Sequence, residues 1–202
     1  MSPRRTRRTA ARTAAVSAAL FTVVLPVSAC STSGDNATGN KGYVSGDGTI
    51  TVIDIADREQ APTLEGDKLG GGTLDTADYA GKTIVLNVWG SWCGECRAEA
   101  DGLVQASKEL ADKTDDQVAF VGLNTRDPSE APALSYVREF DVPYPSLVDQ
   151  DSNLLLNFYG IISPSAIPST LVIDAEGRLA AVVSGPTTAD TLVDLVEDVS
   201  VG

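Results

Sequence analysis

The chain of 202 residues has no histidine and only three cysteines. A structural zinc site usually takes four Cys or His ligands, so one cysteine pair without histidine makes zinc a poor candidate. A single pair also cannot form a disulfide scaffold, which needs several bridges. Basic residues are scarce as well, with 15 Lys and Arg against 28 Asp and Glu. This balance argues against nucleic acid as a partner, because phosphate binding needs clustered Lys and Arg.

No long membrane-spanning run stands at the amino terminus either. The apolar stretch Ala14–Val27 has 14 residues, too few to cross a bilayer comfortably. It follows five arginines and ends in Val27-Ser28-Ala29-Cys30, which is typical of a signal peptide. The ending resembles a bacterial lipobox, which implies cleavage after Ala29 and a diacylglyceryl thioether on Cys30. We therefore predict a lipoprotein signal peptide at residues 1–29. Ordinary secretory cleavage is the alternative, and the export route, general secretory or twin-arginine, stays open.

The next segment, residues 30–48, is predicted to be the lipidated cysteine and a flexible tether. It is rich in Ser, Thr, Gly and Asn, and such a chain spans about 25 Å on average. Loss of residues 1–29 leaves 10 basic and 28 acidic residues, so anionic lipid headgroups would repel the remainder. The lipid on Cys30 would then hold a domain at residues 49–202 on the extracytoplasmic face of the cell membrane.

Within that domain the pattern predicts an α/β order. The run Thr83–Trp89, interrupted only by Asn87, is typical of a strand buried on both faces. An amphipathic helix is expected from Cys93 to about Lys113. The other predicted elements are strands at Ile50–Ala56, Val118–Asn124, Ser169–Asp174 and Leu179–Ser184, a hairpin of Thr63–Glu65 with Gly72–Leu74, and helices at Thr76–Ala80, Ser129–Phe140, Ser152–Tyr159 and Thr188–Val199. Right-handed crossovers make the first strands parallel, which predicts a thioredoxin-type sandwich.

Two of the three cysteines form a C-x-x-C motif, Trp92-Cys93-Gly94-Glu95-Cys96, where the buried strand meets the helix. This spacing is typical of a thiol pair that exchanges electrons with other disulfides. The attacking species is a thiolate, and a helix N-terminus favours negative charge. We therefore predict Cys93 as the nucleophile and Cys96 as the resolving thiol. A zinc half-site and a structural disulfide are the alternatives, and so short a loop would constrain the unfolded chain little.

Further motifs occur in order between about Ala61 and Gly185. They are Tyr79-Ala80-Gly81-Lys82, Trp92-Cys93-x-x-Cys96-Arg97-Ala98-Glu99, Tyr144-Pro145 with Asp149, and Ile167-Pro168-Ser169-Thr170-Leu171-Val172-Ile173-Asp174 with Gly177. On these motifs the chain resembles a membrane-anchored thioredoxin-like thiol–disulfide oxidoreductase of the ResA/TlpA type, in the redoxin (AhpC/TSA-like) superfamily. The resemblance implies a thioredoxin-like fold, with a central mixed β-sheet flanked by helices, an N-terminal β-hairpin extension and a short insertion before the strand that follows a cis-proline.

The resemblance also implies a function. Such proteins pass electrons from a membrane thiol donor, a polytopic reductase, to oxidised protein substrates outside the cytoplasm, often apocytochrome c. We expect no cofactor and a monomer. A thiol oxidase or isomerase on the same fold, and a tethered module that binds without turnover, are the alternatives. A peroxidase is disfavoured, because Gly90 stands where a peroxiredoxin has a threonine.

The resemblance places several residues in support of the cysteines. Pro168 is expected to be cis, although X-Pro bonds are usually trans, and to leave the backbone of Ile167 available to a substrate chain. Glu99 could raise a cysteine pKa or relay a proton, or it is simply an exposed acid in the first helical turns. Trp92 could anchor a partner, and Gly94 with Glu95 completes the motif.

Several positions depart from related sequences, and one of them is Asp101, which stands where a helix-kinking proline is common. Asn87 stands where thioredoxin has a buried acid, and we expect an ordinary hydrogen-bonded strand residue there. Glu95 replaces the usual proline before the second cysteine, and the sequence leaves open whether the pair is reducing or oxidising. The acids Glu95, Glu99 and Asp101 together predict basic or neutral substrates.

Overall fold

The structure is a computed structural model that describes residues 40–45 and 48–200. Its elements, in chain order, are β1 (Asn40–Ser45), β2 (Gly48–Ile53), η1 (Ile55–Asp57), β3 (Glu65–Asp67), β4 (Thr73–Asp75), η2 (Thr76–Tyr79), β5 (Thr83–Trp89), α1 (Gly94–Thr114), β6 (Val118–Thr125), α2 (Glu130–Glu139), β7 (Ser146–Asp149), η3 (Leu155–Phe158), β8 (Ser169–Ile173), β9 (Leu179–Ser184) and α3 (Ala189–Ser200), where η marks a 3₁₀ helix.

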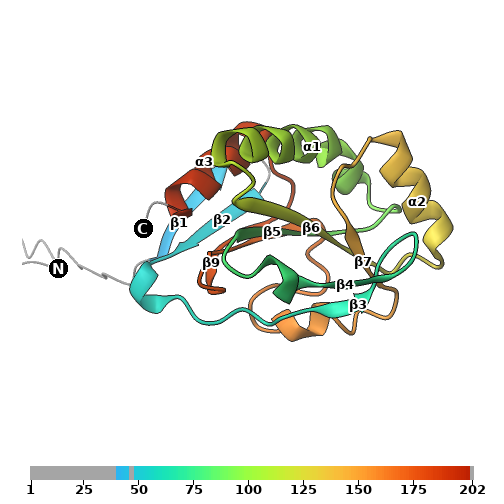
Figure 1. The fold of residues 1–202 in the computed structure, drawn as a ribbon, viewed down its shortest axis with the longest axis horizontal. Coiled ribbons are helices and arrows are strands. Elements are labelled where there is room, and N and C mark those ends of the chain that lie inside the picture. Colours follow the sequence, from blue (N-terminus) through green and yellow to red (C-terminus); the bar gives the residue numbers. More distant parts are fainter. Residues whose placement is uncertain (1–39, 46–47, 201–202) are drawn as a thin grey trace, which may run out of the picture. The chain divides into compact units, whose positions relative to one another are not determined.

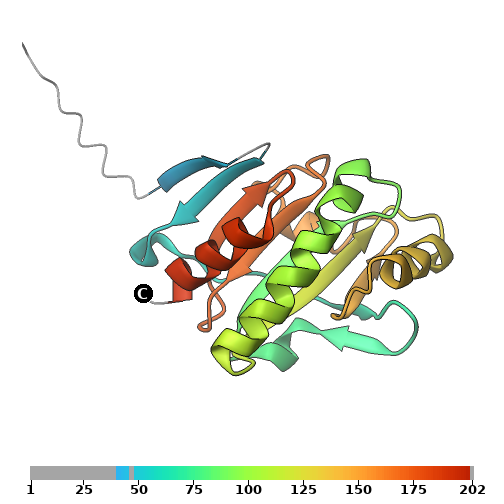
Figure 2. The ribbon, with the colours of Figure 1, turned by 90° about the horizontal axis from the view of Figure 1, so that it is seen from above.

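In the described part of the chain, seven strands form one mixed sheet in the order β1-β2-β9-β8-β5-β6-β7. Strands β5, β6 and β7 are parallel, and β8, β9, β2 and β1 add antiparallel neighbours. Helices α1 and α3 cover one face of the sheet, while the β3–β4 hairpin and η3 lie on the other (Figure 1). Seen from above, α1 and α3 lie side by side (Figure 2). This is the predicted thioredoxin-like α/β fold.

The core explains why the sequence of β5 is apolar at nearly every position. Val85 packs with α1 and α3 in one cluster of buried side chains, whereas Leu86 and Val88 belong to a second cluster that includes Leu64 and Phe158. Alternate residues of a strand point to opposite faces. A strand buried on both faces therefore needs an apolar residue at nearly every position, and its two ends place the flanking loops.

Most predicted elements are confirmed. The strand Thr83–Trp89 matches β5, and the helix expected at Cys93–Lys113 is α1. The predicted hairpin is present as β3 and β4, whose register pairs Glu65 with Asp75, but its first strand runs from Glu65 to Asp67 and not from Thr63 to Glu65. The strand expected at Ile50–Ala56 is partly wrong, because it ends at Ile53 and a 3₁₀ turn follows.

Strand β7 was not predicted. Pro143 and Pro145 indicate a break in the chain, and they do end the preceding segment, but Ser146 pairs with Gly122 of β6 immediately afterwards. Gly122 also lets β7 approach, because a Cβ at this position would lie 2.1 Å from Ser146 Oγ. The strand therefore depends on a partner far away in the sequence.

The predicted boundary between tether and domain is wrong at its carboxyl side. Residues 40–45 form β1, which pairs antiparallel with β2, and Gly48 already belongs to β2. Backbone hydrogen bonds to a neighbouring strand can recruit a segment that has few apolar residues. Residues 40–45, which the prediction assigned to the tether, thus belong to the sheet. The predicted signal peptide, Cys30 and the rest of the tether lie outside the described residues.

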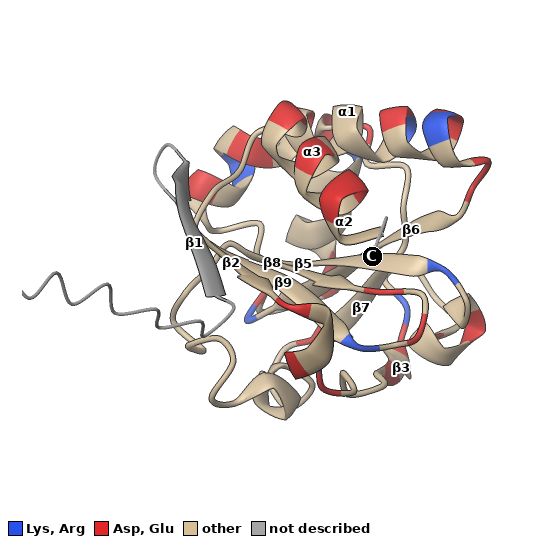
Figure 3. Ribbon diagram, turned by 90° about the vertical axis from the view of Figure 1, so that its left-hand side faces the viewer, with Lys and Arg blue, Asp and Glu red and all other residues tan. Residues whose placement is uncertain are grey.

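Acidic side chains are prominent on the helical layer. Helix α3 carries Asp190, Asp194, Glu197 and Asp198 and no basic residue, and Figure 3 marks acidic positions along its ribbon in red. Over residues 40–45 and 48–200, no helix is both long enough and apolar enough to cross a membrane.

A buried ion pair network joins three distant parts of the domain. The carboxylate of Asp174, the residue directly after β8, lies 3.1 Å from Arg58 Nη1 and 2.9 Å from Arg178 Nη2. Arg58 also donates to the carbonyl oxygens of Ile53 and Val199. The side chains of Arg58 and Asp174 are each 4% exposed. The network therefore links the end of β2, the β8–β9 turn and the end of α3.

We predict that Asp174→Ala lowers the free energy of unfolding by about 3–5 kcal/mol, because it leaves the buried Arg58 guanidinium without an opposite charge. Urea unfolding followed by circular dichroism measures this. The matched control is Asp194→Ala on the exposed side of α3, with an expected change below about 0.5 kcal/mol. Equal losses in the two variants would show that the network contributes nothing of its own.

Candidate active site

The two cysteines lie at the first turn of α1. Cys93 is the N-cap of the helix, and its Sγ accepts a hydrogen bond from the Cys96 N–H at 3.1 Å. The structure joins the two sulfurs in a disulfide, with the Cα atoms 5.3 Å apart. Cys93 is 6% exposed and Cys96 is 0% exposed. The sulfur of the first cysteine is therefore the one that an external thiol or disulfide can reach.

The predicted cis-proline is confirmed. The Ile167–Pro168 peptide bond is cis, and the Ile167 carbonyl oxygen lies 3.7 Å from Cys93 Sγ. The backbone of Ile167 is less available than expected, because its N–H already donates to the Ser165 carbonyl at 3.1 Å. A bound chain could thus pair with the carbonyl group of Ile167 beside the sulfur, but not with its N–H.

The two tryptophans next to the cysteines have different environments. Trp89 is buried, stacks on Tyr136 with ring centroids 4.3 Å apart, and serves packing as expected. Trp92 is 51% exposed, although its indole N–H donates to the Thr125 carbonyl at 3.2 Å. The Arg126 guanidinium lies 4.9 Å from the Trp92 ring centroid. Trp92 therefore forms an exposed aromatic surface next to Cys93, and the hydrogen bond to Thr125 fixes its orientation.

Glu99 is not an exposed helix acid. It is 4% exposed, and its two carboxyl oxygens accept hydrogen bonds from Asn87 Nδ2 at 3.1 Å and from the Thr187 N–H at 3.0 Å. Burial raises its pKa to about 7, although both hydrogen bonds act in the opposite direction. Asn87 also donates to Thr170 Oγ1 at 3.1 Å, so it is a hydrogen-bonded strand residue as expected. A titratable acid thus lies one helical turn after Cys96.

The helix periodicity already carries a signal for the burial of Glu99. Cys96, Ala100 and Leu103 form the buried face of α1, and Glu99 falls within it. A charged residue at a buried position needs partners, and these come from β5 and from the segment before α3. The carboxyl also borders a surface pocket of about 380 Å³ that Gly102 and Thr187 help to line, which offers water a way to it.

The charge expected around the site needs correction. Glu95 is exposed, but Glu99 is not on the surface, so it cannot select basic substrates there. Arg97 forms an ion pair with Glu139 and lies 5.1 Å from the Phe140 ring centroid. With Arg126 beside Trp92, arginines offset the exposed acids. Gly94 has no steric requirement, because an added Cβ would have nothing within 4 Å.

The sequence reasoning did not identify Tyr136. Its hydroxyl donates to the Cys96 carbonyl at 2.8 Å, and its buried ring packs on Trp89. Burial raises its pKa above the usual value, so the hydroxyl stays protonated and remains a donor. Helix α2 thereby fixes the first turn of α1. A second residue that was not identified, Asp127, holds the loop before Cys93 and is treated below.

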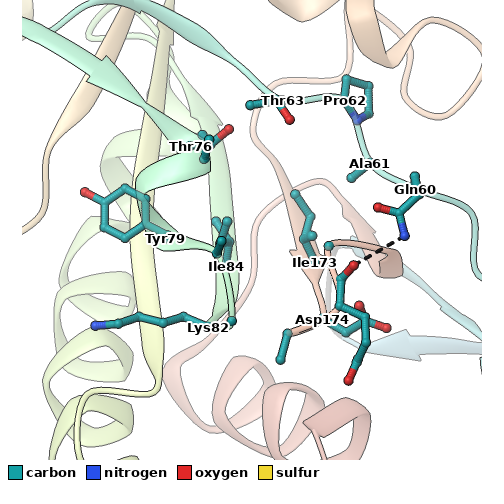
Figure 4. A pocket seen from close by; sticks show the side chains of 16 residues that line it. Gln60, Ala61, Pro62, Thr63, Thr76, Tyr79, Lys82, Ile84, Ile173 and Asp174 are labelled. Carbon is teal, nitrogen blue, oxygen red and sulfur yellow. Dashed lines mark hydrogen bonds between the residues drawn. The ribbon is translucent and has the colours of Figure 1, made fainter.

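A cavity of about 280 Å³ lies away from the cysteines. Tyr79 and Lys82 line one side of it, and Gln60 and Asp174 line the other (Figure 4). Lys82 directly precedes β5, whereas the cysteines follow its opposite end. The cavity is therefore not part of the thiol site.

The fold and the paired cysteines define a thioredoxin-like thiol–disulfide oxidoreductase. The family model described as the AhpC/TSA family matches residues 58–182, and the chain belongs to this family.

Similar proteins are named for thiol–disulfide exchange. The thiol:disulfide interchange protein DsbE of Pseudomonas fluorescens biotype C is 40% identical over 119 residues, which is 57% of this chain and 57% of that protein. The thiol-disulfide oxidoreductase ResA of Bacillus subtilis is 26% identical over 73% of this chain and 78% of its own. A solved secreted thiol-disulfide isomerase from Corynebacterium glutamicum is 32% identical with a TM-score of 0.71, covering 78% of this chain and 98% of its own.

We predict that Glu99 makes the oxidised protein less stable as the pH rises. Its pKa rises from 4.5 to about 7 on folding, so the folded state retains a proton that the unfolded chain has released. The associated stability is fully present below about pH 4.5 and is lost as the pH rises through about 7, with a total of about 3 kcal/mol at most.

Urea unfolding of the oxidised protein at pH 5 and pH 8 measures this loss. Glu99→Gln should remove it, whereas the exposed neighbour Asp101→Asn should leave it unchanged. A Glu99→Gln protein with the same pH dependence as the unmodified chain would contradict the prediction.

Proposed function

We propose that this protein reduces disulfides of protein substrates outside the cytoplasm, with Cys93 as the nucleophile and Cys96 as the resolving thiol. The observation that carries the proposal is the arrangement of one reachable and one buried sulfur, with the buried Glu99 carboxyl one turn beyond. A lipid on Cys30 would hold the domain at the membrane, where a polytopic thiol reductase would supply electrons. Apocytochrome c is the substrate that the sequence resemblance suggests.

The reaction begins with the reduced pair. The Cys93 thiolate attacks one sulfur of a substrate disulfide, which forms a mixed disulfide and releases the other substrate sulfur as a thiolate. The Cys96 thiol then loses its proton and attacks Cys93 Sγ, which releases the second substrate sulfur. Two electrons pass to the substrate, whose two thiolates take up the proton released by Cys96 and one proton from water, and the Cys93–Cys96 disulfide remains for the membrane donor to reduce.

Groups around the cysteines can assist each step of this reaction. The Cys96 N–H donates to Cys93 Sγ, and the helix N-terminus stabilises negative charge on this sulfur. Glu99, with a pKa of about 7, would accept the proton of Cys96 and release it to water through the adjacent pocket. A pKa near the working pH suits a group that both takes and gives a proton.

The same acid favours reduction over oxidation. A strongly oxidising pair owes its potential to a stabilised reduced form. A carboxylate near the sulfurs disfavours the thiolate, so the disulfide gains relative to the dithiol and the pair becomes a better reductant. Glu95 acts in the same direction from the helix surface.

A second function, isomerisation of disulfides, is favoured by one comparison, since the similar secreted protein of Corynebacterium glutamicum is named an isomerase. An isomerase or an oxidase needs a less reducing pair than a dedicated reductant does. The reduction potential therefore separates the candidates.

We predict a potential near that of thioredoxin, about −270 mV, and far from the value of about −120 mV of a strong oxidant. Equilibration with defined ratios of reduced and oxidised glutathione or dithiothreitol measures it. Glu99→Gln should raise the potential by about 30 mV, a change of about 1.4 kcal/mol. Asp101→Asn is the matched control and should leave it unchanged. A wild-type value near −120 mV would assign the protein to the oxidants.

A trapping experiment tests the roles of the two cysteines and names the substrate. Cys96→Ser should accumulate mixed disulfides through Cys93, because the resolving thiol is absent. Non-reducing electrophoresis of acid-quenched cells, followed by mass spectrometry, identifies the partners. Cys93→Ser is the matched control, and it should trap nothing and abolish turnover of a model disulfide. Partner binding that survives Cys93→Ser, with no mixed disulfide from Cys96→Ser, would instead indicate a binding module.

A further inference from the structure

A buried carboxylate holds the loop that precedes the cysteines. Asp127, two residues after the end of β6, is 2% exposed. Its Oδ2 accepts hydrogen bonds from the Ser91 N–H at 3.0 Å and from Asn124 Nδ2 at 2.7 Å, and its Oδ1 accepts one from Ser91 Oγ. Among the described residues no Lys or Arg forms an ion pair with it. Neutral donors alone therefore compensate its burial.

Ser91 lies inside the turn that delivers Cys93 to the helix. The Cys93 N–H donates to the Gly90 carbonyl at 3.1 Å, which closes a turn over Ser91 and Trp92. Gly90 has no room for a side chain, because a Cβ there would lie 2.4 Å from Trp92 Nε1. The bonds to Asp127 thus fix the middle of a tight turn whose last residue is the nucleophile.

A further hydrogen bond ties the same turn to the same segment. The Trp92 indole donates to the Thr125 carbonyl, two residues before Asp127. Residues 124–127 therefore bind both the backbone and the side chains of the turn. Neither Asp127 nor Ser91 touches the sulfur, so they can affect exchange only by placing Cys93.

We propose that Asp127, acting through Ser91, is a positioning residue for thiol–disulfide exchange. It keeps Cys93 Sγ in line with the Cys96 N–H and beside the Ile167 carbonyl, where the incoming disulfide meets it. The proposal concerns the exchange step itself and holds whether the protein reduces, oxidises or isomerises its substrates.

A positioning role and a charge role of Asp127 predict opposite effects on the rate of exchange, which makes the proposal testable. If the hydrogen bonds between Asp127 and Ser91 are lost, the alignment of Cys93 Sγ with the Cys96 N–H weakens. The pKa of the Cys93 thiol then rises and its attack slows. If the carboxylate acted instead by its charge, its removal would favour the thiolate and speed the attack. The other ionisable groups near the turn, Glu95, Arg97, Glu99 and Arg126, are unchanged in every variant.

The experiment compares Ser91→Ala, Ser91→Thr and Asp127→Asn in the full chain. The second-order rate constant of the reduced protein with oxidised glutathione, and the rate of Cys93 alkylation against pH, are measured after circular dichroism confirms folding. Ser91→Ala should lower the rate constant about tenfold and raise the apparent pKa of Cys93. Asp127→Asn should do the same. Ser91→Thr keeps the hydroxyl and should stay within about twofold of the unmodified protein.

Two results would overturn the proposal. Faster exchange in Asp127→Asn with no change in Ser91→Ala would show that the carboxylate acts through charge. A lower free energy of unfolding in Ser91→Ala and Asp127→Asn, with rate constants and pH profiles unchanged, would show that the hydrogen bonds between Asp127 and Ser91 serve stability alone. Should Asp127→Asn fail to fold, Ser91→Ala decides between these outcomes, because it removes one hydroxyl and its bond from a partly exposed loop.

Discussion

The site depends on one junction, the end of strand β5 and the start of helix α1. Strand β5 is buried on both faces and ends at Trp89, so the next residues must turn at a fixed place above the sheet. Helix α1 then begins with unpaired backbone N–H groups, and Cys93 caps it with its sulfur. The Cys93–Cys96 disulfide, the contact of Sγ with Ile167 and the exposure of Trp92 all follow from this junction.

Three separate parts of the chain stabilise this junction. Tyr136 of helix α2 binds the carbonyl of Cys96, the β6 end holds the turn through Asp127, and the segment before β8 brings Ile167 to the sulfur. The end of β6 and the segment before β8 both lie at the carboxyl end of β5, because β6 runs parallel and β8 antiparallel to β5. The arrangement leaves Cys93 slightly exposed and Cys96 fully buried, which suits sequential attack by two thiols.

The sequence allowed accurate prediction wherever a local pattern carried the information. The run Thr83–Trp89, the C-x-x-C motif and the helix that follows are all local signals, and the cis-proline followed from the resemblance of its flanking residues. Strands β1 and β7 were missed because their existence depends on pairing with β2 and β6, not on their own composition. The engaged N–H of Ile167 depends likewise on the fold of residues 163–168, which no local pattern reports.

By itself the sequence determined the fold class, the redox pair and its position at a helix start, because apolar periodicity and motif spacing are properties of neighbouring residues. Only the tertiary structure decided the environment of the charges. It buried Glu99 against Asn87 and Thr187, set Asp127 among neutral donors under the active-site turn, and placed Arg126 beside Trp92. The physical reason is that the pKa and the role of a charged group depend on its solvation and its partners, and these come from segments far apart in the chain.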